Sequence, residues 1–351
     1  MTTAWNQVEP AGDASGRVVV SGLGPVSTVG VGAPAFFDAI IDAFESSGSR
    51  SVYRHDLKRL KADDYVKLRT QCVDPASRIS VIAAALALDD AGWREHACDP
   101  TRIGLVLGTA YGSHETLNDY LRTSSPSPIR FVHTFINTAA GLTSQVFQLR
   151  GAHAVLCSGS LAGMQSIRYA CHLLKAGKAD RIICGGADSA TGPLGQQNEP
   201  GSTFANRTTL EGAGVLALQQ AGHAHRRPHA AIAGFSSASD RSLTSEVFGR
   251  AIRSAMRSAG IDAREVSAVV LATTSAHPVP AMQREALERL GIPARKWLDL
   301  ASFIGDVGAA LSGLGVIAGC ALLKNVRHGQ HVLVVGLDRN QCDVIVLGAK
   351  S

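Results

Sequence analysis

Short apolar runs alternate with longer segments of helical periodicity along most of this chain. Residues 151–190 show the pattern most clearly. An apolar run, Ala152 to Cys157, leads into the turn Ser158-Gly159-Ser160, and hydrophobic positions then recur at helical spacing from Met164 to Leu174. A second apolar run, Arg181 to Cys184, ends at Gly185-Gly186. The pattern predicts a strand, a tight turn, a helix and a second buried strand.

The same kind of unit is predicted elsewhere, and the second half of the chain repeats the first. Strands are expected at Arg17 to Gly24 and Arg102 to Gly108, and helices at Pro34 to Ala43 and Ala76 to Trp93. Three segments of the second half echo earlier ones: 230–236 echoes 17–23, 247–273 echoes 80–109, and 311–335 echoes 161–185. The last pair lies about 150 residues apart, which indicates an internal duplication of alternating strands and helices.

Composition restricts the class of protein. The chain has 351 residues, 45% of them hydrophobic but only 5% aromatic, which suits close packing of helices on sheets. Its net charge of +5 is scattered, so we expect no nucleic-acid partner, although a mildly basic surface suits an acidic protein. The seven cysteines form no CxxC pair, and we expect them to be reduced and to bind no metal. No signal peptide or membrane-length apolar run is present, so a cytoplasmic location is expected.

The turn before the predicted helix is the first candidate site. It places Ser160 at or near a helix N-terminus, where free backbone N–H groups and the helix dipole stabilise negative charge. A thiolate nucleophile or an oxyanion would be placed at such a position. The turn therefore marks the surroundings of Ser160 as a candidate anion-stabilising site.

The flanks of this turn resemble those of the β-ketoacyl synthases, the condensing enzymes of the thiolase-like fold. The motifs that carry the resemblance are Leu149-Arg150-Gly151, Gly159-Ser160-Leu161-Ala162-Gly163, Gly177-Lys178-Ala179-Asp180, Gly185-Gly186-Ala187-Asp188 and Glu211-Gly212-Ala213-Gly214. The resemblance spans Arg17 to Leu347. It implies an α/β fold with a duplicated thiolase-like βαβαβαββ architecture in α-β-α-β-α layers. We expect a flexible tail over 1–16 and two thiolase-like halves, 17–222 and 223–351.

The positions that perform chemistry in this family differ here. The resemblance implies a nucleophilic cysteine and two histidines, and their positions hold Ser160, Thr274 and Asp306. His277 is a candidate for a shifted first histidine. The family's C-terminal loop, rich in glycine and phenylalanine, is replaced by residues 336–341, GLDRNQ. We therefore expect no decarboxylative condensation by this chain alone.

Three interpretations follow from the resemblance and the substitutions. The first is a non-catalytic ketosynthase-like subunit, similar to a chain-length factor, in polyketide or fatty-acid-type biosynthesis. The second is an acyltransferase or esterase that uses Ser160, which requires His277 or His133 to reach it. The α/β-hydrolase motif Gly-x-Ser-x-Gly is not matched, because Ser158 and Ala162 flank Ser160. The third is a divergent but active 3-oxoacyl-acyl-carrier-protein synthase.

The first interpretation implies partners. They are an active ketosynthase subunit, in a heterodimer, and an acyl carrier protein, and a homodimer is possible in isolation. The resemblance places the strand Ala152 to Cys157, with Val155 and Leu156, at the subunit interface, and it places Tyr111, His114 and Phe135 near the partner's acyl tunnel. No cofactor, metal or membrane is implied. The basic connector His223 to His229 is expected to be a solvated loop.

Overall fold

The computed structural model describes residues 16–46, 55–67, 74–96, 98–125, 127–189, 211–273, 279–293, 296–324, 326, 329–338 and 340–349. Its strands are β1 Val18–Ser27, β2 Gly30–Val31, β3 Ile103–Gly108, β4 His153–Leu156, β5 Arg181–Ser189, β6 Glu211–Gln220, β7 Ala230–Ser239, β8 Val266–Thr273, β9 Trp297–Asp299, β10 His331–Asp338 and β11 Gln341–Gly348. Its α-helices are α1 Ala33–Glu45, α2 Pro75–Asp90, α3 His114–Arg122, α4 Pro128–Phe131, α5 Thr138–Phe147, α6 Ala162–Lys175, α7 Ser245–Ala259, α8 Val279–Arg289, α9 Leu300–Ile304 and α10 Ala309–Leu323.

The strand order confirms the predicted duplication. The first half has the order β4-β3-β5-β6-β1, and the second half repeats it as β9-β8-β10-β11-β7. In both halves the first three of these strands are parallel and the last two pairings are antiparallel. The halves are joined where β1 pairs with β7, at Val19 with Ala231 and Val20 with Ala230. The hydrogen-bonded strands thus form one continuous sheet with two equivalent parts.

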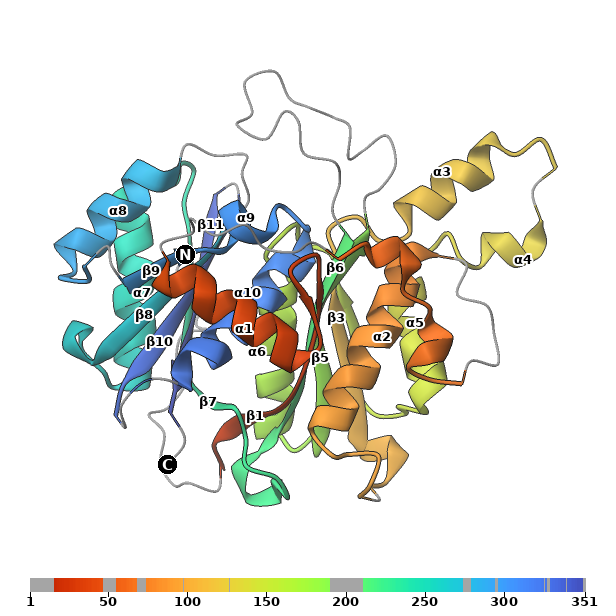
Figure 1. The fold of residues 1–351 in the computed structure, drawn as a ribbon, viewed down its shortest axis with the longest axis horizontal. Coiled ribbons are helices and arrows are strands. Elements are labelled where there is room, and N and C mark those ends of the chain that lie inside the picture. The colour runs from red at the N-terminus through yellow and green to blue at the C-terminus, as the bar shows by residue number, and fades with distance from the viewer. Residues whose placement is uncertain are drawn as a thin grey trace.

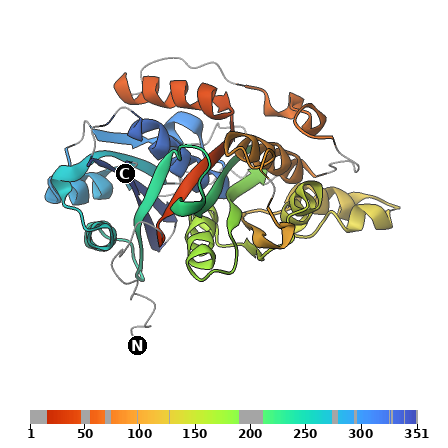
Figure 2. The same cartoon turned by 90° about the horizontal axis from the view of Figure 1, so that it is seen from below.

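The structure has five layers, in which three layers of helices alternate with the two parts of the sheet. Helices α2 and α5 pack on the outer face of the first half, and α7 and α8 pack on the outer face of the second. Helices α6 and α10 lie between the halves, with α1 beside them (Figures 1 and 2). The expected α-β-α-β-α layering is therefore confirmed.

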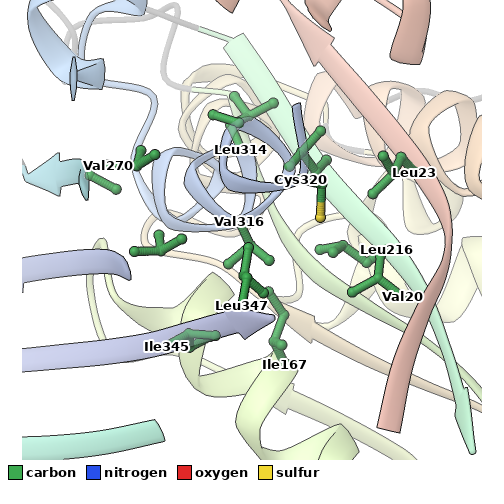
Figure 3. Packing of buried hydrophobic residues seen from close by; sticks show 14 of the residues in the cluster. Val20, Leu23, Ile167, Leu216, Val270, Leu314, Val316, Cys320, Ile345 and Leu347 are labelled. Carbon is green, nitrogen blue, oxygen red and sulfur yellow. The ribbon is translucent and has the colours of Figure 1, made fainter. Parts of the chain in front are cut away.

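The middle layer contains the largest hydrophobic cluster. Every residue of α10 is buried, because the helix contacts β5 and β6 on one side and β8 and β10 on the other. Side chains from both halves converge around it, among them Val20, Leu216, Val270 and Ile345 (Figure 3). A helix that is apolar on all sides is stable only when it is enclosed in this way.

One close approach allows α10 to pack so tightly. Gly214 of β6 faces the backbone of Gly313 and Leu314, and a Cβ atom at Gly214 or Gly313 would overlap the backbone of the other element. The absence of side chains lets helix and strand approach each other directly. This contact fixes the position of the α10 N-terminus relative to the first half.

Two sequence-based expectations are corrected here. Strand β5 continues through Gly185-Gly186 to Ser189, because β6 pairs with it along its whole length. The connector of residues 223–229 is not simply solvated. The Arg226 guanidinium donates to the backbone oxygens of Asp89 and Asp90 at the end of α2, and His229 contacts the Asp90 carboxylate at 2.7 Å.

Other expectations stay predictions. Residues 1–15 of the predicted tail lie outside the described residues. The boundary between 222 and 223 falls within the short 3₁₀ helix Ala221–His223 and stays a prediction. Among the helices described, none has the length and apolar character needed to cross a membrane.

Candidate active site and interaction surface

The candidate site forms where several strands end. β3, β4, β5 and β10 all direct their carboxyl ends toward the N-termini of α6 and α10. In sheets of this kind, ligand sites form at the carboxyl ends of the parallel strands. The turn after β4 contributes Ser160, and the end of β10 contributes Asp338.

Ser160 lies at the start of α6, as the sequence predicts. Its side chain is buried, and its hydroxyl Oγ has no hydrogen-bond partner. A serine nucleophile needs an adjacent base, because its hydroxyl is only weakly acidic. The geometry therefore gives Ser160 no base among the described residues.

The backbone of Ser160 does have a partner, and it is an acid. The Ser160 N–H donates to Asp338 Oδ2 at 2.8 Å. Gly159 has a φ of 70°, and a Cβ atom there would collide with the same carboxylate oxygen. A glycine is thus required at this turn, both for the left-handed backbone and for the approach of Asp338.

Asp188 holds the surrounding loops together. This fully buried carboxylate at the end of β5 accepts hydrogen bonds from the Thr109 hydroxyl and from the N–H groups of Ala110, Tyr111 and Ala309. It therefore links the end of β3 to the N-terminus of α10. Burial raises the pKa of Asp188 to about 6, although these donors favour its ionised form.

Asp306 adds another carboxyl group to the site, and Tyr111 lies beside it. Asp306, in the loop before α10, accepts the Gly308 N–H at 3.0 Å, and burial followed by the charge of Asp338 raises its pKa. The Tyr111 ring lies beside Gly308. Burial, and then the charges of Asp306, Asp188 and Asp338, raise the pKa of Tyr111 to about 12. Asp338 thus contacts the turn, and Asp306 lies close enough to interact with Asp338.

The histidines proposed as bases do not reach Ser160 in the described structure. Thr274 and His277 lie outside the described residues. His133 lies near Asp74, at the N-terminus of α2, and its Nδ1 has no hydrogen-bond partner. The structure thus shows no contact between His133 and Ser160.

An exposed apolar patch begins beside the site. Except for Tyr169, the exposed large hydrophobic side chains of the described residues all fall between 111 and 136: Tyr111, Leu117, Leu121, Ile129, Phe131, Val132, Phe135 and Ile136. We call this set the apolar patch. Its residues lie on α3, α4 and the adjoining loops, and α3 and α4 project from one end of the molecule (Figure 1). Exposed apolar side chains gathered on neighbouring elements are typical of an interaction site.

The loop after β3 joins the patch to the site, and strand β4 of the same half forms a sheet edge. The Ser113 hydroxyl donates to the Phe135 backbone oxygen, and Gly112 lies against Ile136, so the loop after β3 supports the patch. His114, the first residue of α3, is half-buried. Strand β4 pairs only with β3 among the described strands, with Val155 opposite Leu107 and Leu156 opposite Gly108. Its outer edge is therefore open.

The sequence identified some of these residues and missed others. Ser160, Asp306 and Tyr111 were singled out from the sequence, and the structure gathers them around Asp338. Asp188 and Asp338 were visible only as parts of motifs, because their partners lie far away in the sequence. Within the described residues, no group of three or more His, Cys, Asp and Glu side chains could hold a metal ion.

The fold is thiolase-like, and its candidate site lies at a glycine turn at the start of α6. The family model for the N-terminal domain of beta-ketoacyl synthases matches residues 16–198, just over half of the chain. The chain therefore belongs to the beta-ketoacyl synthase family.

Individual proteins agree with this assignment. 3-Oxoacyl-[acyl-carrier-protein] synthase 2 of Vibrio cholerae is 24% identical over 346 residues, which cover 86% of this chain and 84% of the relative. The solved structure of the ishigamide ketosynthase/chain length factor superposes with a TM-score of 0.80 at 24% identity, covering 95% of this chain and 100% of that one. The solved structure of a type II polyketide synthase acyl carrier protein in complex with its ketosynthase superposes with a TM-score of 0.76 at 20% identity. The match covers 95% of this chain and 99% of that one. The structural likenesses establish the fold.

Replacing Asp188 with asparagine should destabilise the protein. One amide group cannot accept all the donors that converge on Asp188, and its NH₂ would face an N–H or hydroxyl donor. We expect Asp188→Asn to lower the free energy of unfolding by about 2–4 kcal/mol, measured by urea denaturation. The control Asp180→Asn, at a partly exposed ion pair with Arg102, should cost less than about 1 kcal/mol. Equal effects of the two variants would contradict the linking role of Asp188.

Proposed function

We propose that this chain is a non-condensing ketosynthase-like subunit, which pairs with an active β-ketoacyl-acyl-carrier-protein synthase and shapes its acyl tunnel. The contact between Asp338 and the Ser160 N–H carries the proposal. It places a carboxylate at the backbone group that would stabilise an acyl oxyanion.

The acidic groups support the loss of condensing chemistry. Decarboxylative condensation requires the binding of a malonyl group and the stabilisation of an enolate, both of which are negative. The Asp338 carboxylate, and Asp306 in its ionised form, would oppose each of these steps by charge repulsion. The partnerless hydroxyl of Ser160 also gives no support to the acyltransferase interpretation.

The pairing with a ketosynthase is supported by the apolar patch and the open edge of β4. Apolar side chains such as Leu121 and Ile129 are 72% and 74% exposed, which is costly in water and favours a covering partner. An open strand edge also favours pairing with a second strand. A stable partner of this kind would bury on the order of 2,000 Å² or more. The solved relative with a ketosynthase/chain length factor pair provides the precedent for such an assembly.

The acyl tunnel is proposed from the position of Tyr111. This residue belongs to the apolar patch, is 39% exposed, and places its ring beside Gly308 at the candidate site. A partner that covers the patch would therefore also contact Tyr111. We propose that acyl carrier protein delivers its substrate to the paired ketosynthase, as the carrier protein complex of the polyketide relative suggests.

The purified chain alone should form no condensation product from acyl- and malonyl-acyl carrier protein. Product should form when a ketosynthase that retains the cysteine and both histidines is added. The Ser160→Ala variant should support the same rate in this pair, because the proposal gives Ser160 no chemistry. Product quantified by mass spectrometry is the readout. Product from the wild-type chain alone, above that of Ser160→Ala alone, would refute the proposal.

A charge in the apolar patch should disrupt the pair without unfolding the subunit. Ile129 is 74% exposed, so Ile129→Glu should leave the free energy of unfolding nearly unchanged. We expect its affinity for the ketosynthase to fall at least tenfold in analytical ultracentrifugation, because a carboxylate would be buried at the interface. Val155 is less suitable, since it packs partly against the core.

The matched control is Ala281→Glu on α8, at the opposite end of the molecule (Figure 1). Ala281 is exposed, and the change in charge is the same. This variant should bind the ketosynthase as the wild type does. Unchanged binding by Ile129→Glu would show that the partner does not cover the patch.

A further inference from the structure

Two backbone N–H groups at the N-terminus of α6 donate to side chains from the other half of the protein. Helix α6 has no side-chain N-cap and no acidic residue in its first turn. The Ser160 N–H instead donates to Asp338 Oδ2, and the Met164 N–H donates to the Ser312 hydroxyl of α10 at 3.0 Å. A helix N-terminus of this kind attracts an anion, and here the anion is a side chain 178 residues away in the sequence.

The turn is shaped around this carboxylate. Gly159 has a left-handed backbone, and the space that a Cβ atom would fill is occupied by Asp338 Oδ2. Strand β10 ends at Asp338, and β8 and β11 pair with β10 on either side, so the backbone that presents the carboxylate is held on both edges. The contact is therefore part of the packed structure.

We propose that the Asp338 carboxylate blocks the turn at Ser160. It occupies the position where an acyl carbonyl oxygen would accept a hydrogen bond from the Ser160 N–H. The proposal deepens the proposed function and rests on it, since it explains why this scaffold takes no acyl group. It assigns to Asp338 an excluding role that is separate from the loss of cysteine at position 160. Restoring a thiol at that position is then insufficient for acyl transfer.

The charge of Asp338 also acts on any thiolate at this turn. A neighbouring anion disfavours ionisation of a thiol, and the carboxylates of Asp306 and Asp188 lie near the same turn. The pKa of the nearby Cys157 thiol is raised as well, first by burial and then by the charge of Asp188. Among the described residues, the titratable groups close to the turn and to its carboxylates include Asp338, Asp306, Asp188, Tyr111 and Cys157.

The test introduces a thiol and then removes the carboxylate. Four full-length proteins are compared: Ser160→Cys alone, and Ser160→Cys combined with Asp338→Asn, Asp338→Gly or Asp306→Asn. Asp338→Asn removes the charge but keeps a side-chain oxygen that can accept the hydrogen bond from the residue-160 N–H. Asp338→Gly removes both the charge and the acceptor. Asp306→Asn is the matched control, because it removes a nearby charge that does not contact the Ser160 N–H.

Two properties of the introduced thiol are measured. Its pKa is obtained from the NMR shift of ¹³Cβ-labelled cysteine, which needs no access for a reagent. Its acylation is followed with the butyryl thioester of N-acetylcysteamine and mapped by mass spectrometry. In that reaction the thiolate attacks the carbonyl carbon, the new S–C bond forms, and N-acetylcysteamine leaves as a thiolate that takes a proton from water.

We expect Ser160→Cys alone to be acylated slowly. Asp338→Asn should lower the thiol pKa by at least about one unit, which means about tenfold more thiolate at neutral pH. Asp338→Gly should increase acylation at least about tenfold over Ser160→Cys alone, since the N–H becomes free for the carbonyl oxygen. Asp306→Asn should change the thiol pKa and the acylation rate clearly less than the variants at 338 do. Equal pKa values and equal acylation rates in all four proteins would overturn the proposal, as would rapid acylation of Ser160→Cys alone.

A second measurement covers the case in which a double variant fails to fold. In the otherwise unchanged protein labelled with ¹⁵N-serine, the residue-160 amide proton should shift upfield in Asp338→Asn, because a charged acceptor is lost. An unmoved resonance would overturn the proposal. These outcomes are distinct from those for the proposed function: condensation by the wild-type chain alone would refute that function, whereas the thiol and amide measurements address Asp338 only.

Discussion

Helix α10 is buried on every side, and the geometry of the site depends on how closely it approaches the first half of the sheet. Gly214 and Gly313 remove the side chains that would separate helix and strand. Because α10 is fixed in this way, its N-terminal Ala309 N–H reaches Asp188, and Ser312 reaches the first turn of α6. The same packing therefore sets the position of both helix N-termini that border the site.

The helix N-terminus at Ser160 is present in this chain, and a carboxylate of the chain itself accepts its hydrogen bond. Backbone N–H groups at a helix N-terminus cost about 1–3 kcal/mol each if they are buried without an acceptor. When no substrate oxygen is to be bound, an acceptor from the chain itself is a stable substitute, and Asp338 provides one. The N-terminus of α6 thus has an acceptor without any bound substrate, as the proposed function requires.

Most of the fold was predictable from the sequence, because it rests on periodic patterns and on an internal repeat. The echo of residues 161–185 in 311–335 corresponds to α6 and β5 in one half and to α10 and β10 in the other. The position of Ser160 was also predictable, since glycines and small residues flank it on both sides. The contact of Asp338 with Ser160 was not, because a hydrogen bond across 178 residues leaves no local pattern. The length of β5 was missed because its glycines resemble a strand end, although pairing with β6 continues through them. Thr274 and His277 fall outside the part of the chain that the structure describes, so their assignments stay predictions.

The location of the acyl group during turnover tests the central claim most directly. The chain and an intact ketosynthase would be incubated together with radiolabelled acyl-acyl carrier protein, and the two subunits would then be separated under denaturing conditions. The account predicts that the label is found on the ketosynthase and that none is found on this chain. Label on this chain, mapped to Ser160, would contradict the account and establish an acyl-transfer role for that serine.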